Sequence, residues 1–283
     1  MSSRAQPHPG AASRLAVFDV DGTLTHTSGI DDACWIQAVE MTFGVSGICT
    51  DWGSYRHSTD EAIGAEIVER HLGRPWTLED RDLLRETFAT LVEHAAREDR
   101  RHFQQVPGAA ALLPHLQRSG WRVALATGGW KRTALLKLRT AGVPVEGLPA
   151  AFADDAWPRQ TLIRLAVARA MGWPEPEPDP VPETEPTAGR GAEPGDGTSQ
   201  SVRTTDAAAP PVHVVYVGDG TWDVTAARAG GYGFVGVASG QRAEALRRAG
   251  AAVVLPDLAD AAGVLECLAA ATPPGPPMEN RTC

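Results

Sequence analysis

Short apolar runs that alternate with helical patterns constrain the fold of this chain more than any other feature of its sequence. The first run covers residues 15–18 and is followed by Asp19 and then by Gly22, as expected for a buried parallel strand that opens at its carboxyl end. Later apolar runs occupy residues 122–127, 150–153, 212–217 and 232–237. Helical patterns occupy residues 109–119, 133–141, 160–171, 223–229 and 241–249. This order predicts an α/β fold with a doubly wound parallel sheet.

One long segment interrupts the alternation. Residues 26–106 separate the first strand from the second, which is far more than a crossover needs. Apolar residues at spacings of three and four predict helices over residues 31–43, 60–72 and 78–100, and Ser58 with Glu61 fits a capping box. We therefore expect a helical cap over residues 26–106. The α/β core then consists of residues 15–25, 107–173 and 212–271.

The segments outside this core differ from it in composition. Residues 174–211 contain nine of the 22 prolines, eight acidic residues and two arginines, so they cannot bury enough apolar surface to fold. We expect this acidic, proline-rich insertion to be disordered. We also expect a disordered N-terminal tail over residues 1–14 and a loose C-terminal tail over residues 272–283.

Charge and cysteine usage limit the partners and the compartment. The formal net charge of -9 argues against non-specific binding of nucleic acid, which needs a concentrated basic surface. No segment approaches the ~20 apolar residues that cross a bilayer. The four cysteines are widely spaced and form no CxxC pair, which favours a reducing compartment. The sequence thus predicts a cytoplasmic protein with no nucleic-acid or membrane partner.

Two pairs of carboxylates follow two of the predicted strands. Asp19 and Asp21 come after the first strand, and Asp219 and Asp223 come after the run at 212–217. Taken alone, the first pair also fits a simple turn between a strand and a helix. If the two strands are neighbours, however, all four carboxylates meet at one edge of the sheet. Their hard oxygens and mutual repulsion suit Mg²⁺ at this edge.

Groups that suit an anion follow other predicted strands. The second strand ends in Thr127 and Gly128, where a hydroxyl and exposed backbone N–H groups can hold phosphate oxygens. Arg159, before the helical pattern at 160–171, is a candidate for the positive charge of such a site. Lys131 and Arg132, close behind Thr127, are the rival candidates.

These motifs together resemble the haloacid dehalogenase (HAD) superfamily of phosphatases and phosphomutases. The resemblance rests on DVDGTLT (residues 19–25) and GDGTWD (residues 218–223), supported by Thr127 and Arg159. It covers residues 15–268 without the acidic insertion. The resemblance implies a Rossmann-like core with an inserted α-helical cap. It also implies a Mg²⁺-dependent phosphatase that hydrolyses a small phosphate monoester through an aspartyl-phosphate intermediate.

The resemblance also implies a role for each matching residue. Asp19 is the expected nucleophile, and Asp21 is the expected general acid and base. Thr127, Gly128 and Arg159 are the expected phosphate-binding residues. The expected Mg²⁺ ligands are Asp19, the backbone carbonyl of Asp21, Asp219 and Asp223.

Two alternatives to a phosphatase stay open on the sequence alone. A sugar-phosphate phosphomutase shares the same nucleophile and differs in whether water or a sugar hydroxyl accepts the phosphoryl group. A non-catalytic regulatory or binding module keeps the fold, although such a module has no need for the carboxylates.

One loop of the cap is a candidate for substrate selection. Tyr55, Arg56 and His57 follow Trp52 and combine aromatic and cationic groups before the predicted helix at 60–72. We expect this loop either to face the phosphate site or to form ordinary solvated surface.

Overall fold

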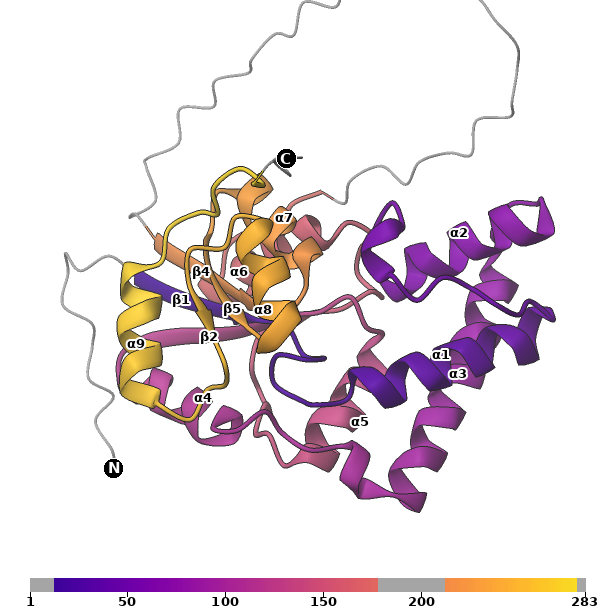
Figure 1. The fold of residues 1–283 in the computed structure, drawn as a ribbon, viewed down its shortest axis with the longest axis horizontal. Helices are drawn as coiled ribbons and strands as arrows, with labels where there is room; N and C mark the ends of the chain where they lie inside the picture. The colour runs from indigo at the N-terminus through magenta and orange to yellow at the C-terminus, as the bar shows by residue number, and fades with distance from the viewer. Residues whose placement is uncertain (1–12, 178–211, 279–283) are drawn as a thin grey trace, which may run out of the picture.

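A six-stranded parallel sheet forms the centre of the molecule. The computed structural model describes residues 13–177 and 212–278. The strands are β1 (Ser13–Phe18), β2 (Trp121–Ala126), β3 (Ala150–Ala151), β4 (Val212–Gly218), β5 (Gly233–Val237) and β6 (Val254–Leu255). Their order in the sheet is β3-β2-β1-β4-β5-β6, and every pairing is parallel. The structure thus confirms the predicted α/β fold (Figure 1).

The register of β1 positions the segments that follow it. Phe18, the last residue of β1, pairs with Leu125 on one side and with Val217 on the other. The residues after β1, β2 and β4 therefore leave the sheet side by side, at the point where the strand order reverses. Open α/β sheets bind their ligands at such a switch point.

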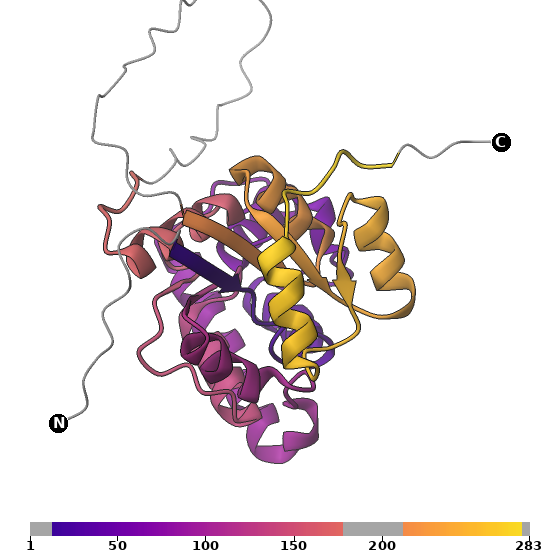
Figure 2. The same cartoon turned by 90° about the vertical axis from the view of Figure 1, so that its left-hand side faces the viewer.

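Helices cover both faces of the sheet. Because successive side chains of a strand point to opposite faces, Ala16 and Phe18 pack on one face while Leu15 and Val17 pack on the other. Helices α4 (Ala109–Arg118), α5 (Lys131–Ala141) and α9 (Ala261–Ala270) contribute to the first core cluster. Helices α6 (Arg159–Met171), α7 (Thr221–Gly230) and α8 (Gly240–Arg248) contribute to the second. Figure 2 shows α9 against its face of the sheet.

A separate group of helices lies beyond the carboxyl ends of the strands (Figure 1). It consists of α1 (Ser28–Phe43), α2 (Asp60–Leu72) and α3 (Leu78–Glu98), with short 3₁₀ helices at Trp52–Ser54 and Arg100–His102. Its own core contains Trp35, Ile67 and Phe88, together with Trp130 from the loop after β2. The rings of Trp35 and Trp130 stack at 6.0 Å, so this helical insertion and the α/β core share a packed contact.

Some predicted elements and boundaries were wrong. The sequence patterns missed β6, which has two residues, and α9. The capping box of Ser58 and Glu61 does not form, because the Ser58 hydroxyl donates to the Trp52 carbonyl and Glu61 accepts from Trp130 Nε1 instead. The capping box of this region lies at the start of α3, between Thr77 and Asp80.

The predicted tails also begin elsewhere. Residues 13 and 14 belong to β1, so the expected tail over residues 1–14 was wrong at these two positions, and residues 1–12 lie outside the described residues. Residues 272–278 are not loose, because backbone hydrogen bonds join Gly275 to Gly250 and Met278 to Arg248. The predicted disorder of residues 178–211 lies outside the described residues. Among the described helices, none is long and apolar enough to cross a membrane.

Candidate active site

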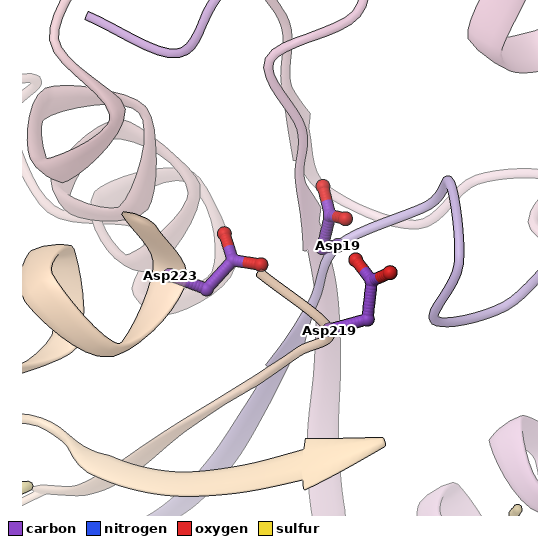
Figure 3. Close-up of side chains that lie close together, drawn as sticks. All are labelled: Asp19, Asp219 and Asp223. Atoms are coloured by element: carbon purple, nitrogen blue, oxygen red, sulfur yellow. The ribbon is translucent and has the colours of Figure 1, made fainter. Parts of the chain in front are cut away.

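Three carboxylates converge at the carboxyl edge of the sheet (Figure 3). Asp19 directly follows β1, Asp219 follows β4, and Asp223 lies in the first turn of α7. One ligand atom from each of the three lies within 4.8 Å of the others, so the group could hold a metal ion. The parallel pairing of β1 with β4 brings the two sequence motifs together.

The Asp219 carboxylate has room at the sheet edge because Gly22 faces it. Gly22 has a φ of +82°, and a Cβ atom there would lie 1.9 Å from Asp219 Oδ2. Any other residue at position 22 would therefore displace the Asp219 carboxylate as well as strain the turn. This gives Gly22 of the first motif a geometric role.

The environment of these carboxylates favours a nearby cation. Burial raises the pKa of Asp19 to about 7, and repulsion from Asp223 adds to the rise although Arg159 opposes it. Burial, with the charges of Asp19 and Asp223, holds the pKa of Asp219 well above its usual range. A divalent cation between Asp19 and Asp219 would offset this cost and keep both groups ionised.

Asp223 differs from the other two carboxylates. Its side chain is completely buried, and both of its oxygens already accept hydrogen bonds. Tyr216 Oη donates to Oδ1 at 3.2 Å, and the Gly220 backbone N–H donates to Oδ2 at 2.9 Å. Asp223 therefore orients the neighbouring groups and contributes less to the open face of the site.

Arg159 is the cation at the centre of the site. Its Nη1 donates to Asp19 Oδ1 at 3.0 Å and lies 3.1 Å from Asp223 Oδ1. Its Nη2 donates to the Ser58 backbone carbonyl at 2.8 Å, which links the helical insertion to the site. The loop at Gly128 leaves room for this guanidinium, because a Cβ at Gly128 would lie 2.4 Å from Arg159 Nη2.

The rival cations lie elsewhere. The Lys131 ammonium lies 6.0 Å from the centre of the Phe152 ring, and neither Lys131 nor Arg132 lines the cavity beside Asp19. Arg132 pairs with Glu86 and Glu93 of α3. Among these candidates, the structure places Arg159 alone against Asp19.

Lys137 on α5 is a central residue that the sequence motifs do not include. Its side chain is 1% exposed, and its Nζ donates to Asp21 Oδ2 and to Asp31 Oδ1 at 2.6 Å each. Burial alone would lower the pKa of Lys137, but the two carboxylates outweigh it and raise that pKa. The signal in the sequence was a lysine among the apolar positions of the helix at 133–141, since such a buried lysine needs a charged partner.

Asp21 is held on both of its carboxylate oxygens. Thr27 Oγ1 donates to Oδ1 at 2.5 Å, and Lys137 donates to Oδ2. The side chain keeps 20% of its surface exposed and lines the cavity. Asp21 therefore combines a fixed orientation with access to a bound molecule.

A cavity of about 230 Å³ lies between the sheet edge and the helical insertion. The α/β core contributes Asp19, Asp21, Thr127, Gly128, Arg159 and Asp219 to its walls. The insertion contributes side chains that include Trp35, Trp52 and Asp60. The cavity has the size of a small organic molecule, and the candidate nucleophile, phosphate-binding and metal-binding residues lie on its wall at the sheet edge.

The predicted selecting loop does not line this cavity. Tyr55 is buried and donates its hydroxyl to the Cys49 carbonyl, and Arg56 pairs with Glu69 on the surface. Tyr55, Arg56 and His57 instead line a separate depression beside α7. Of the two alternatives for this loop, the structure does not support the one in which Tyr55, Arg56 and His57 face the phosphate site, because Trp52 and Ser58 of the same segment line the cavity instead.

Several solved structures share this fold. A hydrolase from Pseudomonas syringae is 23% identical, with 89% of this chain and 97% of that chain covered at a TM-score of 0.61. A HAD hydrolase of family IA, variant 3, from Entamoeba histolytica is 13% identical, and the alignment covers 90% of this chain and 99% of that chain at a TM-score of 0.56. CbbY from Rhodobacter sphaeroides, in complex with phosphate, is 18% identical, and the alignment covers 88% of this chain and 96% of that chain at a TM-score of 0.52.

Family models match most of the α/β core directly. The model described as haloacid dehalogenase-like hydrolase matches residues 16–154, and the model described as HAD-hydrolase-like matches residues 196–261. No curated protein matches the chain. The two matches include both carboxylate motifs in their expected order. The chain is thus an enzyme that belongs to the haloacid dehalogenase-like hydrolases.

Proposed function

We propose that the chain is a Mg²⁺-dependent phosphatase that hydrolyses a small phosphate monoester through an aspartyl-phosphate on Asp19. The observation that carries this proposal is the position of Arg159 Nη1, 3.0 Å from Asp19 Oδ1 in the wall of one cavity. A carboxylate nucleophile beside a fixed guanidinium suits a phosphoryl group, whose oxygens the guanidinium can bind. The phosphate held by CbbY, which shares the fold, supports the same reading.

The carboxylates that face the cavity fit Mg²⁺. Asp19 and Asp219 are hard oxygen donors that lie open to the cavity, and the backbone carbonyl of Asp21 would complete the set. Asp223, whose oxygens already accept hydrogen bonds from Tyr216 and Gly220, would orient the neighbouring groups or bind the ion through water. Bound Mg²⁺ would offset negative charge on the phosphoryl oxygens.

The residues of the chain then divide the reaction into two steps. Asp19 Oδ attacks phosphorus, the bond from phosphorus to the ester oxygen breaks, and Asp21 donates a proton to the leaving oxygen. In the second step Asp21 takes a proton from water, the water oxygen attacks phosphorus, and the bond to Asp19 breaks to release phosphate. Thr127 and the backbone at Gly128, together with Arg159, would bind the phosphoryl oxygens throughout.

The helical insertion would act as the cap of this site. Its residues form the outer wall of the cavity, and Arg159 holds the Ser58 carbonyl of the insertion. A closed cap excludes bulk water, which strengthens the electrostatic contacts to the phosphoryl group.

A cytoplasmic location is part of the proposal and rests on the widely spaced free cysteines.

The test is release of phosphate from p-nitrophenyl phosphate, with and without Mg²⁺. We expect Mg²⁺-dependent release from the wild type, and a loss of about 10³-fold or more in Asp19→Asn, because the amide keeps the shape but removes the nucleophile. The matched control is Asp82→Asn, which makes the same change on the exposed surface of α3.

The outcomes separate the proposal from its alternatives. Turnover of Asp19→Asn within tenfold of wild type would refute the nucleophile. Transfer of the phosphoryl group to a sugar without release of phosphate would indicate a mutase. A wild-type protein that releases no phosphate at all would indicate a binding module.

A further inference from the structure

The cavity contains more carboxylates than the proposed reaction uses. Asp31, Asp32, Asp51 and Asp60 line it in addition to Asp19, Asp21 and Asp219. All four additional groups belong to the helical insertion, so they surround the part of a substrate that lies away from the sheet edge. Their partners decide whether they are available to that part.

Two of the four carboxylates are already satisfied by the protein. Asp31 pairs with Lys137, and Asp60 accepts from Trp35 Nε1 and from the Trp130 backbone N–H at 2.9 Å each. Neither of the other two forms an ion pair among the described residues, although burial raises the pKa of Asp32 and the charge of Arg242 opposes that rise. Asp32 accepts a hydrogen bond from Trp52 Nε1 at 2.8 Å. Asp51 directly precedes Trp52 in the sequence and is exposed.

The cavity has few positive groups to balance these charges. Seven aspartates line it against two arginines, of which Arg159 pairs with Asp19 and the 64% exposed Arg242 lies 3.4 Å from Asp219 Oδ2. Lys137, behind the wall, neutralises only Asp21 and Asp31. A phosphate group brings further negative charge. A leaving group with a second phosphate or a carboxylate would therefore be repelled by Asp32 and Asp51.

The hydrogen-bonding groups of the wall distinguish an ammonium from a hydroxylated leaving group. A hydroxyl donates one hydrogen bond and can also accept, whereas an ammonium donates three hydrogen bonds and accepts none. Among the described residues, the lining contains no Lys, His, Asn or Gln. Its donors besides the two arginines are short hydroxyls and indole N–H groups, of which those of Trp35 and Trp52 already donate to Asp60 and Asp32. A wall that offers acceptors in excess suits the ammonium.

The aromatic residues of the wall suit the same group. Trp52 fixes Asp32 through its indole N–H, so a carboxylate oxygen lies beside an indole ring. Trp35 lies 5.8 Å from Trp52, and both line the cavity. A carboxylate held at the edge of an indole ring attracts an organic cation through its charge, and the apolar rings beside it exclude water that would screen this attraction.

We propose that the preferred substrate is a small phosphate monoester whose leaving group carries an ammonium, held by Asp32 and Asp51 beside Trp52. This inference rests on the proposed phosphatase activity and specifies its substrate class. The phosphate would lie at Asp19 and Arg159, and the ammonium would point toward the helical insertion. The insertion thus selects the substrate by charge.

The test compares three esters that differ only at the far end of a two-carbon leaving group. They are phosphoethanolamine, 2-hydroxyethyl phosphate and phosphoglycolate, with release of phosphate measured in the presence of Mg²⁺. We expect kcat/KM to fall in that order, with about tenfold or more between the first and the last, as expected for a charge-assisted contact replaced by a repulsive one.

Variants connect this preference to the named carboxylates. In Asp32→Asn the ratio of kcat/KM for phosphoethanolamine to that for 2-hydroxyethyl phosphate should fall about tenfold, since a charged hydrogen bond is lost. Asp51→Asn should lower the same ratio, and the surface control Asp82→Asn should leave it unchanged. A ratio does not depend on how much of the protein is folded.

The outcomes are separable from the proposed function. If p-nitrophenyl phosphate is hydrolysed but 2-hydroxyethyl phosphate or phosphoglycolate is the best of the three esters, the ammonium assignment is overturned while the phosphatase stands. An unchanged ratio in both Asp32→Asn and Asp51→Asn would also overturn it. If the wild type hydrolyses no ester, the proposed function fails and the substrate class fails with it.

Discussion

Lys137 shows how much one buried side chain can organise at the residue scale. It lies between Asp21 of the first motif and Asp31 of the helical insertion, with 1% of its side chain exposed. Burial of an ammonium is costly unless hydrogen-bonded carboxylates surround it. Here those carboxylates come from two parts of the molecule, so the same lysine both fixes Asp21 and attaches α1 to the core.

Replacing Lys137 should therefore be expensive. Lys137→Met keeps much of the volume but leaves the partly buried Asp21 and Asp31 without their cation, and we expect the free energy of unfolding to fall by about 3 kcal/mol. Urea denaturation measures this change. Lys131→Met is the control, because Lys131 is exposed and its replacement should cost less than about 0.5 kcal/mol. Equal midpoints for both variants would show that the buried ion pairs contribute nothing.

At the scale of the element, the start of α3 is fixed by a capping box. Thr77 Oγ1 accepts from the Asp80 N–H, and the Asp80 carboxylate accepts from the Thr77 N–H and from both terminal nitrogens of Arg74. The Arg74 hydrogen bonds, together with those from Thr77, lower the pKa of Asp80 to about 2. This cap begins the longest helix of the insertion.

The lowered pKa of Asp80 makes the stability of the insertion depend on pH. The pKa of Asp80 in the folded state lies below its unfolded value of 3.8. The ionised carboxylate therefore stabilises the folded protein fully above pH 3.8, and this stabilisation is lost as pH falls through about 2. Solvent screening at Arg74 limits it to about 1 kcal/mol. The difference in unfolding free energy between wild type and Asp80→Asn should thus fall by about half from pH 5 to pH 3. Asp82→Asn should show no such change, and a constant difference for Asp80→Asn would contradict the role of the carboxylate.

At the scale of the whole molecule, the composition of residues 174–211 leads to a prediction about the acidic insertion. Excision of residues 178–211, with a Gly-Ser linker of about ten residues between α6 and β4, should leave the Tm and the release of phosphate nearly unchanged. The retained Glu175 keeps its ion pair with Arg169. Thermal unfolding and turnover of p-nitrophenyl phosphate check both quantities. A large loss of either would show that the excised residues contribute to the fold or to the site.

The sequence by itself determined the order of strands and helices and the identity of the carboxylate motifs. Both are local properties, since a strand shows its period within a few residues and a parallel sheet brings all carboxyl ends to one edge. For this reason Asp19 and Asp219 could be expected together if their strands were neighbours, and the structure shows that β1 pairs with β4. The missed elements, β6 and α9, lie close to the C-terminus, and β6 is too short to show a period.

Only the tertiary structure decided which cations serve the site and which loop faces it. Arg159 reaches Asp19 across 140 residues, and Lys137 reaches Asp21 across 116. A lysine among apolar helix positions indicates burial, but no local pattern names the partner of Lys137 or of Arg159, because each contact depends on how α5 and α6 pack against the sheet and the helical insertion. The direction of the loop at Tyr55 was decided in the same way, by burial of its ring within the insertion. Packing between distant segments thus chose among side chains that the sequence alone left equivalent.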